Sequence, residues 1–182
     1  MARRRRTRPK KARSPLFKLS GEIRNIIWRF ALLREEPIVF HTGGIEEEPL
    51  LLTCRAIRKE TASIFYRENS LMCKGGSFDS TSLLVFDRKM ISLGYELVMP
   101  NLTLGITHGT SWPNLILWLQ RYHAGETAAS PNYAGYTDAK SCVLESMFLL
   151  VNKLEDHPWE VVKDLLDLQR RTLVALDKGW AV

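Results

Sequence analysis

Residues 16–33, LFKLSGEIRNIIWRFALL, decide how the fold begins. Their large apolar side chains recur at spacings of three and four, the period of one face of an α-helix: Leu19, Ile23, Ile26, Ile27, Phe30 and Leu33. Ser20 precedes the pattern as a helix cap, and Glu22 lies in the first turn, where a carboxylate favours the helix dipole. We therefore expect an amphipathic helix that buries this apolar face.

Residues 49–69, PLLLTCRAIRKETASIFYREN, repeat the amphipathic pattern. Its apolar face comprises Leu51, Cys54, Ile57 or Arg58, Thr61, Ile64 and Phe65. We expect a second helix that packs on the first, with Cys54 as a small buried residue. The charged side chains of the pair form either a recognition surface or a structural ion-pair network, and we favour the network: Glu22, Arg24, Arg55, Arg58 and Glu60.

Three blocks of this region carry a family resemblance. They are LSGEIRNIIW at 19–28, LLTCRAIRKE at 51–60 and IFYRENSL at 64–71. In this order they resemble the fungal F-box-like "two E-x-R" domain, which reads L-P-x-E-I-R-N-x-I-Y, then L-L-x-x-C-R-x-I-R-x-E-A, then F-Y-x-x-N-x-F. The chain departs from that pattern at Ser20, Trp28 and Leu71, where the family has proline, tyrosine and phenylalanine. The resemblance covers residues 16–72.

The resemblance implies a protein-interaction module. True F-box proteins dock on a Skp-type adaptor of a cullin ubiquitin ligase, and the rest of the chain then receives a substrate protein. Helix-in-groove docking would use the side chains Leu19, Ile23, Ile26, Ile27 and Trp28. The domain's own core needs the same side chains, and they cannot be fully buried twice. We expect a non-enzymatic fungal protein that serves as a substrate adaptor.

The N-terminal stretch MARRRRTRPKKARSP is strongly basic and contains no acidic residue. Outside it, 18 basic residues face 20 acidic ones, so the net charge of +6 belongs to this stretch. We expect residues 1–15 to be disordered and to serve nuclear import or to contact nucleic-acid phosphates. The alternative function is therefore a nuclear protein, or one shared between nucleus and cytoplasm, that associates non-specifically with nucleic acid through Arg3, Arg4, Arg5, Arg6, Arg8, Lys10, Lys11 and Arg13.

The remaining chain predicts short strands and then helices. Strands are expected at 37–41, 70–74 and 97–107, whereas the apolar run at 82–90 is strand or buried helix. A helix should follow Ser111, a long loop spans 124–140, and helices follow at 142–154 and from Pro158. The last helix carries an apolar stripe that we assign to the core: Trp159, Val162, Leu165, Leu166, Gln169, Leu173 and Leu176. The fold class is α+β, with residues 73–182 packing on 16–72 as one globular domain.

The sequence contains no recognisable catalytic motif. The sequence has no GxSxG, GxxxxGK[ST] or GxGxxG pattern, and its four histidines are scattered. The three acidic residues at 46–48 are expected to be a solvated loop rather than a metal site. Three cysteines favour a reducing compartment, and no stretch is long enough to span a membrane. We expect no cofactor and no metal; an active site assembled from distant residues stays open.

Overall fold

The computed structural model describes residues 14–97, 100–107, 109–131, 133 and 137–181. The α+β class and the helical C-terminal part are confirmed. The helices are α1 (Gly21–Leu32), α2 (Arg55–Glu68), α3 (Thr81–Ser92), α4 (Trp112–His123), α5 (Ala139–Lys153) and α6 (Trp159–Leu176). The strands are β1 (Ile38–Phe40), β2 (Leu71–Gly76) and β3 (Leu102–Thr107), and the 3-10 turns are η1 (Pro15–Lys18), η2 (Pro49–Leu52) and η3 (Lys178–Ala181).

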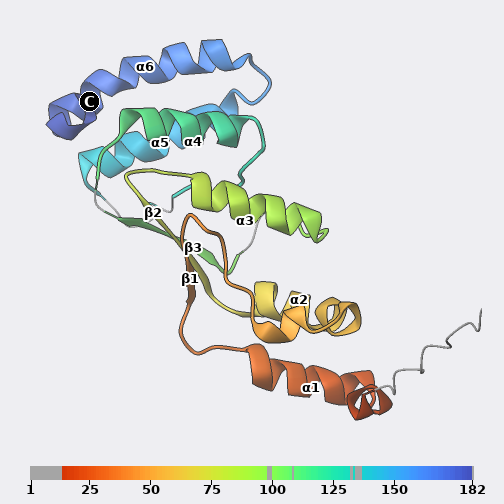
Figure 1. Ribbon diagram of the computed structural model, residues 1–182. Coiled ribbons are helices and arrows are strands. Elements are labelled where there is room, and N and C mark those ends of the chain that lie inside the picture. Colours follow the sequence, from red (N-terminus) through yellow and green to blue (C-terminus); the bar gives the residue numbers. More distant parts are fainter. Residues whose placement is uncertain (1–13, 98–99, 108, 132, 134–136, 182) are drawn as a thin grey trace, which may run out of the picture.

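The helices are stacked in the order of the chain (Figure 1). The α1–α2 pair lies at one end of the stack, the sheet and α3 lie in the middle, and α4, α5 and α6 form the other end. One hydrophobic core runs through these layers, from Trp28 in α1 to Trp180 in η3. Among the described residues, no helix is long and apolar enough to cross a lipid bilayer.

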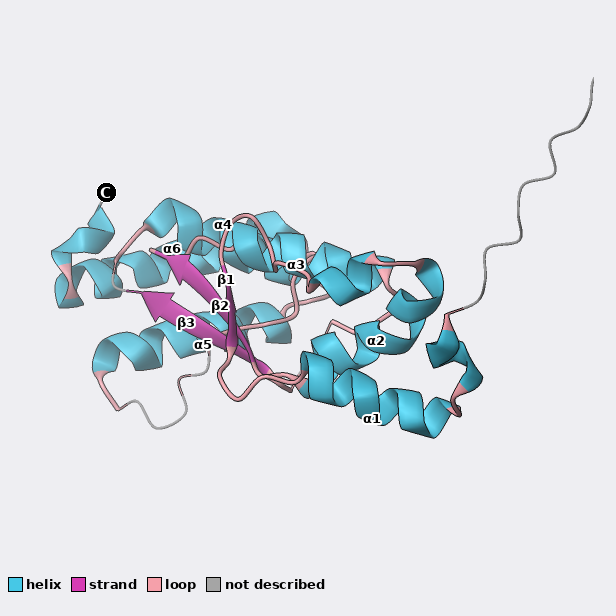
Figure 2. Cartoon of the chain, turned by 60° about the horizontal axis from the view of Figure 1, so that its bottom comes forward, coloured by secondary structure: helices cyan, strands magenta, loops and turns pink. Residues whose placement is uncertain are grey.

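The sheet has three parallel strands in the order β1-β2-β3 (Figure 2). Phe40 and Cys73 are register partners that face the core, where the Phe40 ring stacks on Phe86 of α3 at 4.9 Å. Val39 and Thr103 are exposed because strand side chains alternate between the two faces. The helices therefore bury one face of the sheet.

Two asparagine amides tie α1 and α2 to the start of the sheet. Asn69 is buried after α2, and its Nδ2 donates to the carbonyl oxygens of Leu32 and Phe65 at 3.1 and 3.0 Å. Its Oδ1 accepts from the backbone N–H of Arg34 at 2.8 Å. Asn101, just before β3, donates to the carbonyl oxygens of Tyr66 and Asn69. These bonds fix the end of α1 against the strands.

Residues 49–69 and 82–90 differ in detail from their prediction. The expected second helix is two elements, η2 and α2, and Cys54 lies between them as the N-cap of α2. Cys54 is exposed, so its assignment as a buried residue is wrong. Residues 82–90 form part of helix α3, which the apolar run alone did not distinguish from a strand.

The acidic loop at 46–48 is more than a solvated segment. Glu47 is 10 % exposed and accepts from Tyr66 Oη at 2.5 Å, from Arg58 at 2.6 Å and from Lys89 at 2.9 Å. Burial raises the pKa of Glu47, but the hydrogen bonds from Tyr66 and Lys89 outweigh it and the net shift is downward. Glu47 thereby joins the loop to α2 and α3.

Candidate protein-interaction surface

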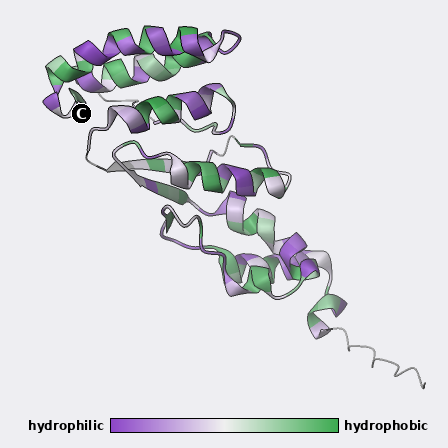
Figure 3. Cartoon of the chain, turned by 45° about the horizontal axis from the view of Figure 1, so that its top comes forward, coloured by the Kyte–Doolittle hydropathy of each residue, from purple (hydrophilic) through white to green (hydrophobic). Residues whose placement is uncertain are grey.

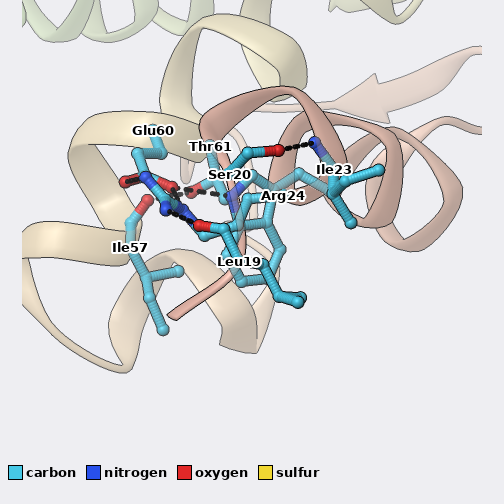
Figure 4. Close-up of polar contacts among 8 residues, drawn as sticks. Leu19, Ser20, Ile23, Arg24, Ile57, Glu60 and Thr61 are labelled. Carbon is cyan, nitrogen blue, oxygen red and sulfur yellow. Dashed lines mark hydrogen bonds and ion pairs between the residues drawn. The ribbon is translucent and has the colours of Figure 1, made fainter. Parts of the chain in front are cut away.

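Helix α1 begins as its sequence predicts. The Ser20 hydroxyl accepts from the backbone N–H of Ile23 at 3.4 Å (Figure 4). Glu22 lies in the first turn of the helix. The preceding turn η1 starts at Pro15 and ends before Leu19. The N-terminus of α1 is thus fixed beside the turn that enters it.

The face of α1 that packs on the protein is the opposite of the one expected. Trp28 and Leu32 are the two fully buried residues of α1, at 2 % and 1 % exposure. At 100° per residue, Trp28 points about 160° away from both Ile26 and Phe30 on the helix. The prediction that the main apolar face of this helix packs on the second helix is therefore wrong.

Polar side chains on the packed side hold α1 to α2. Arg24 donates to both carboxylate oxygens of Glu60, at 2.9 and 2.8 Å, and to the Leu19 carbonyl at 2.7 Å (Figure 4). Trp28 Nε1 donates to the same carboxylate at 3.0 Å. The hydrogen bonds from Arg24 and then Trp28 lower the pKa of Glu60. A second bidentate pair joins Arg29 to Glu68 at 2.8 and 3.0 Å.

The expected ion-pair network is present only in part. Arg24 and Glu60 pair as described, whereas Arg58 pairs with Glu47 instead. Within the described part of the chain, Glu22 and Arg55 form no ion pair. The Arg29–Glu68 pair was not expected, because neither residue was among the predicted members of the network.

Replacing Glu60 by alanine should lower the melting temperature by roughly 3–6 °C at neutral pH. The change removes three charge-assisted hydrogen bonds and leaves Trp28 Nε1 without its acceptor. Because the pKa of Glu60 is lowered in the folded state, this contribution is present at neutral pH and is lost on acidification. The matched control is Glu68→Ala, whose ion pair is more exposed. Equal melting temperatures for the two variants would contradict the role given to Glu60.

The apolar face predicted for α1 points to solvent. We call its five exposed residues the α1 stripe: Leu19, Ile23, Ile26, Phe30 and Leu33. Phe30 is 93 % exposed and Ile26 63 %. Of the residues expected to bind a partner, Leu19, Ile23 and Ile26 lie on the stripe, Ile27 is half-buried at its side, and Trp28 is in the core.

The predicted basic tail and the question of a metal site can be compared with the structure in turn. The basic residues Arg3 to Arg13 lie outside the described residues. Among the residues that the structure does describe, no cluster of three or more His, Cys, Asp or Glu side chains is arranged to hold a metal ion. Phe30 and Leu33 are the members of the α1 stripe that the expected binding set lacked, although the helical period of the sequence contained both.

The α1 stripe consists of apolar side chains, so it can bind another apolar surface by burying area against it. Monomeric soluble proteins rarely expose a large contiguous apolar patch, and such patches mark interaction sites. Core packing and partner binding use different residues of α1, because Trp28 and Leu32 are buried in the core and the α1 stripe is exposed. No protein-family model, no curated protein and no solved structure matches this sequence.

Proposed function

We propose that this chain is a non-enzymatic protein-interaction module of the fungal F-box-like type, and that the α1 stripe docks on a Skp-type adaptor of a cullin ubiquitin ligase. The observation that carries the proposal is the exposure of the stripe on a helix whose opposite face is already anchored. A helix held in this way presents its anchors without ordering cost on binding. The α1 stripe lies at the other end of the stack from α4, α5 and α6, which leaves the rest of the chain to receive a substrate protein.

The choice of an adaptor rests on the resemblance of residues 16–72, and the choice of surface rests on the geometry. Leu19 and Ile23 belong to both, since they match the family pattern and are exposed, and the exposed Ile26 lies in the same block at a position that the pattern leaves open. Helix α1, which carries most of the stripe, has 12 residues and is about 18 Å long at 1.5 Å per residue. That length suits an amphipathic helix bound in an apolar groove.

Replacing both Ile26 and Phe30 by aspartate should weaken binding to a purified Skp-type adaptor about 100-fold or more, because burial of each side chain is worth about 1.5–3 kcal/mol. Isothermal titration calorimetry with the full chain measures this directly. Both side chains are exposed, so the melting temperature should stay within about 2 °C of the wild type.

The matched control is Ile91→Asp, which changes an exposed apolar residue of α3 outside the stripe. It should bind the adaptor as the wild type does. If the folded wild type does not bind the adaptor, the link to ubiquitin ligation is wrong. If Ile26→Asp with Phe30→Asp binds unchanged, the adaptor does not use the α1 stripe.

A further inference from the structure

A second exposed apolar row lies on α6, at the other end of the molecule from α1 (Figure 1). Its inner face buries Val162, Leu166 and Leu173 as expected, but Leu165 and Leu176 of the predicted core stripe are exposed. Figure 3 shows hydrophobic and hydrophilic residues mixed along this outer helix. We call the exposed row the α6 stripe: Val161, Leu165, Leu168 and Leu176.

Helix α5 widens the α6 stripe. The two helices pack on each other after the short connection at 154–158, and Ser146 Oγ lies 3.3 Å from Gln169 Oε1. In an antiparallel pair with this register, residue 149 falls beside residue 165, one turn from the hydrogen bond on each helix. Leu149 and Leu165 are both exposed, so the apolar surface extends over two helices.

The α6 stripe is nearly symmetric about its most exposed member. Leu168 is 70 % exposed, with Val161 seven residues before it and Leu176 eight residues after it. Asp164 and Arg171, on the flank away from α5, stand four residues before and three after. Both are exposed, and neither has an ion-pair partner within the described ranges of the chain.

This pattern fits a second copy of the same helix. When two copies of α6 run antiparallel and cross at Leu168, Val161 of each copy meets the region of Leu176 of the other. Asp164 of each copy then faces Arg171 of the other, which gives two reciprocal ion pairs. A self-complementary patch of this kind is what a two-fold interface requires.

We propose that the α6 stripe is the contact between two copies of this chain, related by a two-fold axis at Leu168. The stripe spans 16 residues, about 22 Å, which is small for a stable interface. The dimer therefore dissociates in the micromolar range and its two reciprocal Asp164–Arg171 pairs set the register. The α1 stripes, which lie at the other end of each copy, stay free in this dimer.

Sedimentation velocity of the full chain over about 1–200 µM tests the proposal. The mass should rise from that of the 20.9 kDa monomer towards twice that value as concentration increases. Leu168→Asp should remain monomeric throughout, whereas Ile91→Asp should follow the wild type. The pair Ile26→Asp with Phe30→Asp should also dimerise normally, which separates this contact from the α1 stripe and from the proposed function.

The ion pairs give a second, independent test. Arg171→Asp should weaken the dimer at least tenfold, and adding Asp164→Arg to it should restore the dimer, because the reciprocal pairs are then reversed. Leu168→Cys, made with Cys54→Ser and Cys142→Ser to remove the exposed native thiols, should form a disulfide-linked dimer under mild oxidation. A monomeric wild type at all concentrations, a dimer unaffected by Leu168→Asp, or a double charge reversal that stays monomeric would each overturn the proposal.

Discussion

Replacing Trp180 by alanine should lower the free energy of unfolding by about 3–5 kcal/mol, the usual cost of removing a fully buried large aromatic side chain. Trp180 is 0 % exposed, and its ring lies 5.2 Å from that of Phe78. Arg170 in α6 donates to the carbonyl oxygens of Trp180 and Ala181, at 3.4 and 3.1 Å. The side chain therefore fills the core between η3 and the loop after β2.

Urea unfolding followed by circular dichroism measures the effect of Trp180→Ala. The matched control is Trp159→Ala, which removes a tryptophan that is only partly buried. We expect the control to lose less than half as much stability. Similar losses for the two variants would mean that the buried side chain of Trp180 contributes no more stability than the partly buried side chain of Trp159.

Asp87 should make the stability of the protein fall as the pH rises from about 4 to about 7. The side chain is 0 % exposed in α3, and burial raises its pKa to about 7, with one backbone N–H, that of Ala128, donating to it at 3.4 Å. Its other oxygen has no hydrogen-bond partner among the described residues. Because the folded-state pKa lies above the unfolded one, the folded protein binds more protons in this pH range. Raising the pH through about 7 therefore costs stability on the order of 2–4 kcal/mol.

Replacing Asp87 by asparagine tests this directly. The variant keeps an acceptor for the Ala128 N–H and cannot ionise, so it should be more stable than the wild type at pH 8, and its advantage should shrink or reverse at pH 5. Chemical unfolding at both values gives the comparison. Asp156→Asn, which changes an exposed carboxylate between α5 and α6, is the control and should leave the pH dependence of the wild type intact. Parallel stability curves for wild type and Asp87→Asn would refute the assignment.

Periodicity, caps and turn residues predicted much of the fold. The Ser20 and Ser111 caps, the strands at 37–41 and 70–74, and the helices from 112 and 159 all appear near their expected bounds. These features are local, because a cap or an alternating strand depends on residues a few positions apart. The parallel pairing of β1, β2 and β3 is not local, and nothing in the sequence specified it.

Periodicity did not decide which face of α1 is buried. Two faces of this helix carry apolar residues. The narrower face is the buried one, because Trp28 and Arg24 on that side both donate to the carboxylate of Glu60. That contact joins residues 32 and 36 positions apart, beyond any sequence pattern. Trp180 was missed for the same reason, since a single aromatic after a helix has no period. The exposed stripes could be listed from the sequence, but their exposure needed the tertiary structure.

The amides of Asn69 and Asn101 have a consequence for how α1 is presented. They carry no net charge, so dissolved ions do not screen their hydrogen bonds as they screen the exposed Arg29–Glu68 pair, for which the screening length is about 8 Å at physiological ionic strength. Raising the ionic strength should therefore weaken the Arg29–Glu68 pair and leave the hydrogen bonds of the two amides intact. The place where the C-terminal end of α1 meets the sheet therefore rests on neutral groups, and we expect it to be the same in dilute and concentrated salt.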